Sequence, residues 1–469
     1  MPTRSFATPI LFLASLALAA AQDVDSSKLD AFFNAQLAKN AAPSISAAVV
    51  KDGKIVYAKA FGYADLENDV LATPATVYRI GSITKQFTAT MIMQLVGEGK
   101  LTLEQKCRSV LPELPAAWDA ITVRQLLNHT SGIKSYTSVP GLFDGPAMKP
   151  TTPAGILKTV ETAPLEFKPG TKWNYNNTAF EVLGMIVEKL DHRKYAESLK
   201  ARILGPLGMT STYFTSERTI VKHRAQGYSE GQGGKGWEHA PYLNMDWPFA
   251  AGSIESCTLD LAKWDAALYG DRILPQSALK QMWTPTRLAD GKTQDYGFGW
   301  SLGKQNGVPI VEHGGGIHGF ITFIRRAPSH GLTVIVLTNS GGGPADKIAA
   351  EAMGIVDLAL KVDPPKAIAD TDPKATAKAR ALLQSLMDGK LDHTLFTPEF
   401  NKQITPQLEA GAKATLSGMG KIVRFDLTST ESAGGLTSRK YLVTLGATDL
   451  NLVVRVDGKG LVAEFGLRP

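Results

Sequence analysis

Two short apolar runs lie close together near the start of the chain, at residues 45–50 and 55–61. The four residues between them, 51–54, are charged or glycine and include the pair Asp52-Gly53. An Asp-Gly pair between two strand-like runs is typical of a β-hairpin. The pattern therefore predicts two antiparallel strands here.

Apolar residues then recur every four positions, and Gly97 and Gly99 end the pattern. This spacing predicts a buried helix, and its apolar members are Ile83, Phe87, Met91 and Leu95. Ser82 and Lys85 stand at the beginning of the same segment. Because residues three apart on a helix share a face, we expect these two side chains to lie together on an adjacent face.

The remaining pattern predicts helices at 154–161, 178–190 and 259–268, followed by strands at 297–302, 309–312, 319–325 and 332–337. Strands at both ends with helices between them indicate one antiparallel sheet in an α+β fold. After Pro364-Pro365, which disfavours a helix, helices at 372–387 and 398–416 and strands within 423–467 are expected. We therefore predict a domain at 28–360, a linker at 361–371 and a small C-terminal α+β domain at 372–469, of unknown role.

The first 21 residues have the pattern of an export signal: Arg4, an apolar stretch from Phe6 to Ala20, and small residues at the end. No later run is long enough for a membrane helix. The sequence thus predicts an exported, periplasmic or secreted protein, with no membrane span once the signal is removed.

Composition changes this picture little. The 44% hydrophobic and 20% charged residues are those of a globular protein, and the net charge of +6 comes without a basic cluster, so nucleic-acid binding is not expected. The two cysteines, Cys107 and Cys257, could form a disulfide in an exported protein, but the sequence does not decide whether they do. The oligomeric state is equally open.

The candidate chemistry begins with Ser82-x-x-Lys85. An amine on the same helix face can take the proton of the serine hydroxyl, and the helix N-terminus favours the negative charge that follows. Ser82 is therefore a candidate nucleophile and Lys85 a candidate base. Alone, this tetrapeptide fits an ordinary helix start with an exposed lysine equally well.

Two further elements supply possible partners. Tyr175-x-Asn177 stands in a polar turn before a helix, where a tyrosine near a lysine could act as base or proton shuttle. The stretch from His313 to Gly316 follows a strand, and its glycines would let a substrate lie against the backbone. His313 and His318 match no usual metal-ligand spacing, and an α/β-hydrolase would need a Gly-x-Ser-x-Gly elbow, which is absent. Neither a metal nor a cofactor is expected.

The three elements in this order resemble the active-site motifs of the serine β-lactamase and penicillin-binding-protein superfamily. Neighbouring phrases resemble its class C-like serine hydrolases, namely residues 121–133 (ITVRQLLNHTSGI), 167–170 (FKPG), 206–209 (PLGM) and 296–300 (YGFGW). The resemblance covers about residues 28–360. It implies a β-lactamase/DD-peptidase-like fold, with an antiparallel sheet flanked by helices and an all-helical subregion.

The resemblance also implies roles. Ser82 would form an acyl-enzyme while Lys85 and Tyr175 share the proton transfers, the order between them being open. The N–H groups of Ser82 and Gly316 would form the oxyanion hole. Substrate would be bound by Asn177, His313, Gly314 and Gly315, whereas His129 is expected to be structural.

This chain departs from dedicated β-lactamases in the third motif, where His313-Gly314-Gly315 replaces Lys-Thr-Gly. A glycine at position 314 removes a hydroxyl that would bind a substrate carboxylate. We therefore expect a D-amino-acid peptidase, a carboxypeptidase or a carboxylesterase acting on a small-molecule or short-peptide acyl substrate, possibly peptidoglycan fragments. A β-lactamase and a non-catalytic protein that binds peptidoglycan fragments remain alternatives.

Overall fold

The computed structural model describes residues 24–39, 41–215, 219–231, 236–363, 365–446 and 448–468. The predicted export signal, residues 1–21, lies outside these ranges. Within them, no helix is both long and apolar enough to span a bilayer.

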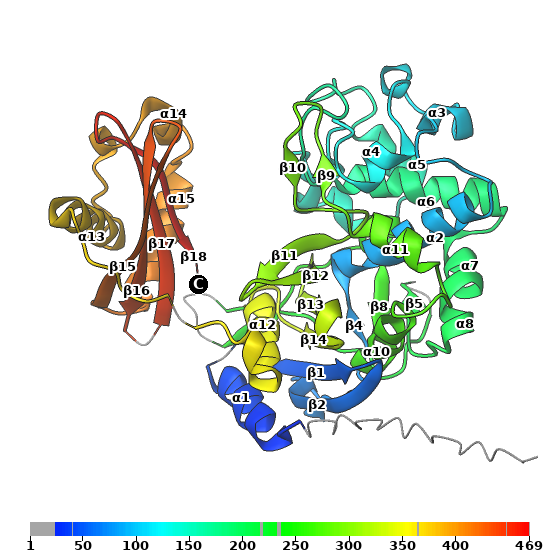
Figure 1. Cartoon of the computed structure of the whole chain (residues 1–469), viewed down its shortest axis with the longest axis horizontal. Coiled ribbons are helices and arrows are strands. Elements are labelled where there is room, and N and C mark those ends of the chain that lie inside the picture. Colours follow the sequence, from blue (N-terminus) through cyan, green and yellow to red (C-terminus); the bar gives the residue numbers. More distant parts are fainter. Residues whose placement is uncertain are drawn as a thin grey trace, which may run out of the picture.

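A seven-stranded antiparallel sheet organises the larger part of the chain (Figure 1), and its strand order is β11-β12-β13-β14-β1-β2-β3. The first and the last strand of this sheet along the chain, β1 and β14, are paired with each other, with Ala47 opposite Val336. This pairing confirms the predicted sheet of distant segments, and β1 with β2 confirms the predicted hairpin. The strands are β1 Ser44–Lys51, β2 Lys54–Asp65, β3 Val70–Leu71, β11 Ser301–Gln305, β12 Val308–Ile317, β13 Phe320–Ala327 and β14 Leu332–Thr338.

Both faces of this sheet are covered. On β1, Ala47 and Val49 belong to one core with helices α1 (Ser26–Ala38) and α12 (Ala345–Val356), whereas Ala48 and Val50 belong to the core on the opposite face. Successive residues of a strand point to opposite faces. Residues 47–50 of this strand are therefore all apolar instead of alternating with polar residues.

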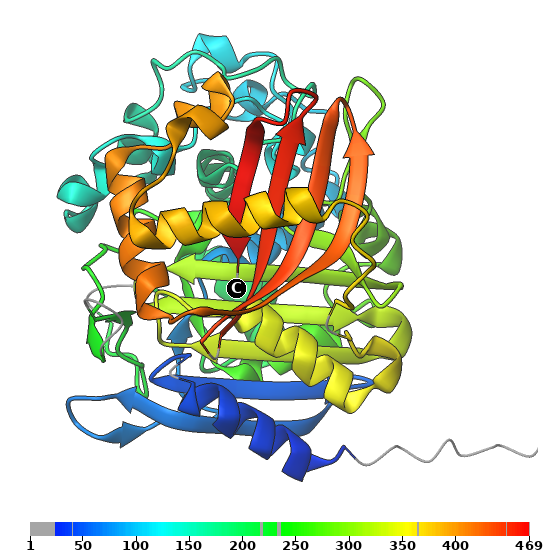
Figure 2. The ribbon, with the colours of Figure 1, turned by 90° about the vertical axis from the view of Figure 1, so that its left-hand side faces the viewer.

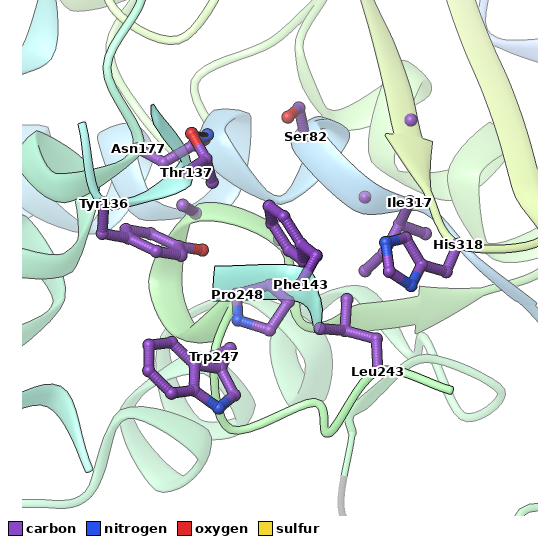
Figure 3. A pocket seen from close by; sticks show the side chains of 14 residues that line it. Ser82, Tyr136, Thr137, Phe143, Asn177, Leu243, Trp247, Pro248, Ile317 and His318 are labelled. Carbon is purple, nitrogen blue, oxygen red and sulfur yellow. Dashed lines mark hydrogen bonds between the residues drawn. The ribbon is translucent and has the colours of Figure 1, made fainter. Parts of the chain in front are cut away.

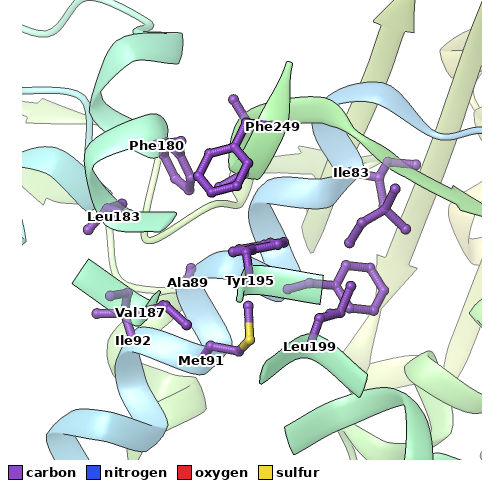
Figure 4. Close-up of a cluster of buried hydrophobic side chains, with 14 of the residues drawn as sticks. Ile83, Ala89, Met91, Ile92, Phe180, Leu183, Val187, Tyr195, Leu199 and Phe249 are labelled. Atoms are coloured by element: carbon purple, nitrogen blue, oxygen red, sulfur yellow. The ribbon is translucent and has the colours of Figure 1, made fainter. Parts of the chain in front are cut away.

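Helix α2 (Thr84–Gly97) runs through the second core and is buried on nearly all sides, which confirms the predicted buried helix. It packs between α6, α7 and α9, whose side chains meet around Tyr195 and Phe249 (Figure 4). This helical region, with α10 on the sheet, comprises α3 Cys107–Val110, α4 Val123–Leu127, α5 Pro153–Lys158, α6 Asn177–Asp191, α7 Tyr195–Leu199, α8 Gly205–Leu207, α9 Phe249–Gly252, α10 Thr258–Ala267 and α11 Gln276–Met282. The helices predicted at 154–161, 178–190 and 259–268 are confirmed within a few residues.

Small sheets complete this part. Strand β8 (Ile254–Ser256) joins β4 (Tyr78–Arg79) to β5 (Tyr213–Phe214), and so fixes the segment that leads into α2. Two further pairs are β6 (Tyr228–Glu230) with β7 (Trp237–His239), and β9 (Thr286–Arg287) with β10 (Thr293–Gln294).

Two strand boundaries differ from the prediction. The strand expected at 297–302 begins only at residue 301, because Gly299 turns the chain with a φ of +71°. This turn packs against α2, and an added Cβ on Gly299 would lie 2.7 Å from the Lys85 carbonyl oxygen. The strand expected at 309–312 continues through the glycines to Ile317. Glycine lowers strand propensity, so sequence alone places this end too early.

Residues 373–468 form a separate layer of helices on a four-stranded antiparallel sheet with its own apolar core (Figure 2). Helix α13 (Pro373–Asp388) crosses one face of this sheet, whose strands are β15 Ile422–Ala433, β16 Leu436–Leu445, β17 Thr448–Asp457 and β18 Val462–Arg468. The single helix expected at 398–416 is instead α14 (Pro398–Asn401) and α15 (Pro406–Gly418), because Pro406 starts a new helix behind the Thr405 cap.

The two cysteines do not pair. Cys107 and Cys257 are both buried as free thiols, and burial raises the pKa of each. Each therefore behaves as a small apolar side chain in the core.

One ion pair connects α10 to the central sheet from inside the protein. Asp265 Oδ1 accepts hydrogen bonds from Arg326 Nε at 2.5 Å and from Thr333 Oγ1 at 2.7 Å. Both charged side chains are fully buried, and the Arg326 guanidinium lies 5.0 Å from the centre of the Trp283 ring. Loss of one partner would leave an uncompensated charge in the core.

We therefore predict that Asp265→Asn lowers the free energy of unfolding by about 3 kcal/mol or more, measured by urea denaturation. Asp25→Asn is the matched control, because Asp25 pairs with Lys28 at the surface and such pairs contribute about 1 kcal/mol or less. Equal stability losses in the two variants would contradict the assignment.

Candidate active site

Ser82 lies in a tight turn that two distant segments hold in place. The turn is a 3-10 segment, Gly81–Ile83, directly before α2. The N–H of Ile80 donates to the Ile254 carbonyl at 3.0 Å, and the Ile254 N–H donates to Thr84 Oγ1 at 3.1 Å. Strand β8 therefore holds the backbone on both sides of Ser82. Ser82 lies directly before α2, as the sequence predicts.

Lys85 reaches Ser82 from the first turn of α2. Its Nζ donates to Ser82 Oγ at 3.1 Å, to Asn177 Oδ1 at 2.8 Å and to the Ala251 carbonyl at 2.9 Å. The side chain is 0% exposed, and its Nζ lies 4.8 Å from the centre of the Tyr175 ring. The structure thus brings together four of the residues that the sequence predicts or implies for one site, Ala251 being an addition.

Burial determines the charge of this lysine. Removal from water disfavours the ammonium form and lowers the pKa of Lys85 to about 7, an effect that the carboxyl group of Glu181 opposes. A substantial fraction of Lys85 is therefore a neutral amine near pH 7. A neutral amine can accept a proton from the hydroxyl that it contacts.

Tyr175 and Asn177 are positioned where α6 begins. Asn176 caps the helix by accepting from the Ala179 N–H at 2.8 Å, and Asn177 Nδ2 donates to Thr137 Oγ1 at 3.1 Å. The Tyr175 Oη atom is buried and makes no direct hydrogen bond. Burial raises the pKa of Tyr175, and the Ser82 hydroxyl opposes this change. Tyr175 therefore holds its proton at neutral pH.

The glycines of β12 let this strand press against the Ser82 turn. An added Cβ on Gly315 would lie 1.9 Å from the Ile80 carbonyl oxygen, and one on Gly81 would lie 3.1 Å from the Gly316 nitrogen. Thr322 Oγ1 of β13 also donates to the Ile80 carbonyl at 3.1 Å. This close approach brings the backbone of Gly316 against Gly81, the residue before Ser82.

His313 is held inside the protein, away from the pocket wall. Its Nδ1 contacts the Gly314 carbonyl at 2.7 Å and must donate to it, so Nε2 accepts from Tyr296 Oη at 2.9 Å. Burial, with a smaller effect from the Lys85 charge, lowers the pKa of His313 to about 4, and the hydrogen bond to the Gly314 carbonyl opposes this change. The ring is therefore neutral, and both of its nitrogens are already occupied.

His129 lies beneath the same group of rings. Its Nδ1 accepts from the Asn176 N–H at 3.1 Å, and its ring centre lies 4.4 Å from that of Tyr175 and 4.7 Å from that of Tyr296. Burial, together with the Lys85 charge, lowers the pKa of His129 well below its usual value. Its contacts are those of a neutral side chain that supports Tyr175.

A pocket of about 120 Å³ opens at Ser82 (Figure 3). Of the predicted site residues, Ser82, Asn177 and Gly316 line it, whereas the side chains of Lys85 and Tyr175 lie behind it and residues 313–315 do not reach it. Phe143 lies between Tyr136 and His318, and its ring centre is 5.5 Å from that of His318. The pocket thus has an apolar and largely aromatic wall.

Sequence reasoning missed most of this wall, because its residues come from loops and short turns without a motif. Tyr136 and Thr137 belong to the 3-10 turn η3 (Tyr136–Ser138), and Phe143 to the turn η4 (Leu142–Asp144). The other missed lining residues are Gly81, Leu243, Trp247, Pro248, Ala251, Gly252, Ile317 and His318. Glu181, which lies below Lys85, was missed as well.

Comparison with known proteins agrees with this fold. A family model described as Beta-lactamase matches residues 29–358, and the chain belongs to this family. Penicillin-binding protein 4* of Bacillus subtilis (strain 168) is 33% identical over 304 residues, which are 61% of this chain and 66% of that protein. The chain thus spans slightly less than two thirds of this relative. The β-lactamase/DD-peptidase-like fold expected from the sequence is confirmed.

Two other similar proteins extend into the C-terminal module. A D-aminopeptidase of Gluconobacter oxydans (strain 621H) is 25% identical over 402 residues, 86% of this chain and 75% of that protein. A solved structure of an octameric penicillin-binding protein homologue from Pyrococcus abyssi is 25% identical, with a TM-score of 0.63 over 95% of this chain and all of that chain. The match to this solved relative therefore includes residues of the small C-terminal module.

We predict that Gly315→Ala lowers kcat/KM about 100-fold, because the new methyl group would displace β12 from the Ile80 carbonyl and move the Gly316 N–H away from Ser82. Hydrolysis of a p-nitrophenyl ester and far-ultraviolet circular dichroism would be measured together. Gly303→Ala is the control, since an added Cβ there meets nothing within 4 Å. Unchanged kcat/KM in a folded Gly315→Ala protein would refute this prediction.

Proposed function

We propose that the protein is a serine hydrolase that forms an acyl-enzyme on Ser82 and acts on esters and amides of small, uncharged, apolar acyl groups. The observation that carries this proposal is the 3.1 Å hydrogen bond from Lys85 Nζ to Ser82 Oγ at the floor of an apolar pocket. It joins a nucleophile to a buried amine of lowered pKa. Such an amine is available as a free base near pH 7.

In this proposal Lys85 is the general base of acylation. Its pKa of about 7 makes the neutral amine abundant, whereas burial keeps Tyr175 protonated. Ser82 Oγ attacks the carbonyl carbon while its proton passes to Lys85 Nζ. The N–H groups of Ser82 and Gly316 would stabilise the oxyanion, and each such donor contributes about 3 kcal/mol in other hydrolases. The proton then leaves with the alcohol or amine, with Tyr175 as a possible relay.

The pocket wall supports an uncharged acyl group. None of its described lining residues is Asp, Glu, Lys or Arg, and most are apolar or aromatic. A charged group would lose its hydration there without gaining an ionic partner. The volume of about 120 Å³ is close to that of a cavity that admits a benzene-sized ligand, about 150 Å³.

The same features disfavour a carboxypeptidase and a β-lactamase within this proposal. Both kinds of substrate carry a carboxylate near the scissile bond. Here His313 is neutral, with both ring nitrogens bound inside the protein, and Gly314 offers no side chain. An amidase or esterase needs no such anion site. The D-aminopeptidase of Gluconobacter oxydans is a similar protein whose name supports cleavage of an amide bond, although an aminopeptidase substrate carries an α-ammonium that the acyl group proposed here lacks. Export through residues 1–21, and any contact with peptidoglycan fragments, stay predictions.

We predict that a fluorophosphonate probe labels the protein and that Ser82→Ala abolishes at least about 99% of the labelling, because the probe needs an activated nucleophile. Labelling would be read from in-gel fluorescence at equal protein concentration. Ser109→Ala, which changes an exposed serine, is the control and should label normally. Equal labelling of Ser82→Ala, or none of the wild type, would favour the non-catalytic binding protein instead.

We also predict that kcat/KM for p-nitrophenyl butyrate exceeds that for mono-p-nitrophenyl succinate at least about tenfold. The two acyl chains have the same length, but the second ends in a carboxylate that the uncharged wall would desolvate. D-phenylalanine p-nitroanilide, a D-Ala-D-Ala peptide and nitrocefin complete the panel. Faster turnover of the succinate ester, or nitrocefin as the best substrate, would overturn this assignment of the acyl group.

A further inference from the structure

Glu181 is a buried acid at the back of the candidate site. It lies on α6 one turn after Asn177, whose side-chain oxygen accepts from Lys85 Nζ at 2.8 Å. Residues four apart on a helix share a face, so Glu181 is on the face of α6 that looks toward Lys85. The side chain is 0% exposed.

The carboxyl group of Glu181 has no hydrogen-bond partner on either oxygen. A buried carboxyl without partners destabilises a fold, and an apolar residue of similar size would normally be more stable there. The surroundings are indeed apolar, since Val182, Leu183 and Phe180 of the same helix are all buried. Packing alone therefore gives no reason for an acid at this position.

The titratable groups that act on Glu181 come from three neighbouring elements. They are Lys85 of α2, Tyr136 of η3 and Tyr195 of α7. Burial raises the pKa of both tyrosines, so each is neutral near pH 7. Lys85 is the one cation among these three groups.

The other elements packed on α6 add no charge at this point. Arg108 of α3 pairs with Asp119 at 3.3 Å. Residues 249–252 of α9 carry no titratable side chain. Arg124 of α4 pairs with Glu104 at 2.6 Å instead. Lys158 of α5 is exposed to solvent. The interaction of Glu181 is therefore directed at Lys85.

We propose that Glu181 is a positioning residue of this site, which sets the protonation of Lys85 from the far side of the amine. This inference rests on the proposed function, because it assigns a partner to the base of that reaction. An ionised Glu181 stabilises the ammonium form of Lys85, and a neutral one does not. The two groups thus titrate as a coupled pair.

The direction of each charge effect agrees with this assignment. Burial lowers the pKa of Lys85 and the negative charge of Glu181 opposes it. Burial raises the pKa of Glu181 well above its usual value and the positive charge of Lys85 opposes it. The nearby Ala251 backbone N–H opposes it as well, although this N–H donates its hydrogen bond to the Pro248 carbonyl. Glu181 therefore keeps the pKa of Lys85 higher than burial alone would leave it.

The test is the pH dependence of acylation in Glu181→Gln, which keeps the size of the side chain and removes its charge. Because the base must be neutral, the rate rises with pH through the pKa of Lys85. We expect the acidic limb of kcat/KM for p-nitrophenyl butyrate to move down by about one pH unit. The Lys85 titration should move equally in an NMR experiment on [13Cε]lysine-labelled protein, with its signal assigned from Lys85→Arg.

Thr88→Val is the matched control for packing. Thr88 Oγ1 bonds the Ala250 carbonyl and Tyr195 Oη, each at 2.6 Å, in the same interior. Thr88→Val should lose stability without moving the acidic limb. Glu181→Asp keeps the negative charge, so its acidic limb should move less than that of Glu181→Gln. An unmoved Lys85 titration in folded Glu181→Gln would refute the role of Glu181. If the fluorophosphonate probe still labels Ser82 in that case, the proposed function stands without the role of Glu181. If the probe does not label Ser82 but the Lys85 titration moves in Glu181→Gln, only the proposed function is refuted.

Discussion

The burial of one amine constrains the whole site. Lys85 Nζ makes its three hydrogen bonds to α6, to α9 and to the serine turn at the start of its own helix. An unpaired amine in the interior would destabilise the fold, so these elements must close around it together. The core between α2, α6, α7 and α9 (Figure 4) is what holds them at that distance. The packing that stabilises the helical region therefore also determines the geometry of the site.

The second constraint comes from the sheet. Strands β12 and β13 reach the serine turn only because position 315 has no side chain and because Thr322 bonds the Ile80 carbonyl. Residues 80 and 315 are far apart in sequence, yet the pairing of β1 with β14 places both ends of the domain in one sheet. The sheet thus places residues 313–316 against the Ser82 turn, while the helical region places Tyr175 and Asn177 beside it.

Local patterns were enough to predict the hairpin, α2 and the Ser82–Lys85 contact, because each depends on neighbours within a few residues. The pocket wall could not be predicted, since Phe143 and Trp247 line one pocket only through the folding of η4 and of the loop before α9. Glu181 was hidden for another reason: in sequence it is one polar residue in an apolar helix, and only its burial without partners makes it unusual. The length of β12 was missed because strand propensity does not register the pairing of glycines with β13.

The ionisable groups of the site and the residues that line its pocket are different residues. Its buried ionisable groups, Lys85 and Glu181, lie behind Ser82, whereas the described wall of the pocket carries no Asp, Glu, Lys or Arg. Charges in that position act on the proton of the nucleophile, where the low dielectric makes them strong, and give little binding energy to the substrate. Discrimination between substrates then depends on shape and on the cost of desolvating a charge. An arrangement of this kind can transfer acyl groups of varied structure with one set of proton-handling residues, provided that the acyl group is neutral.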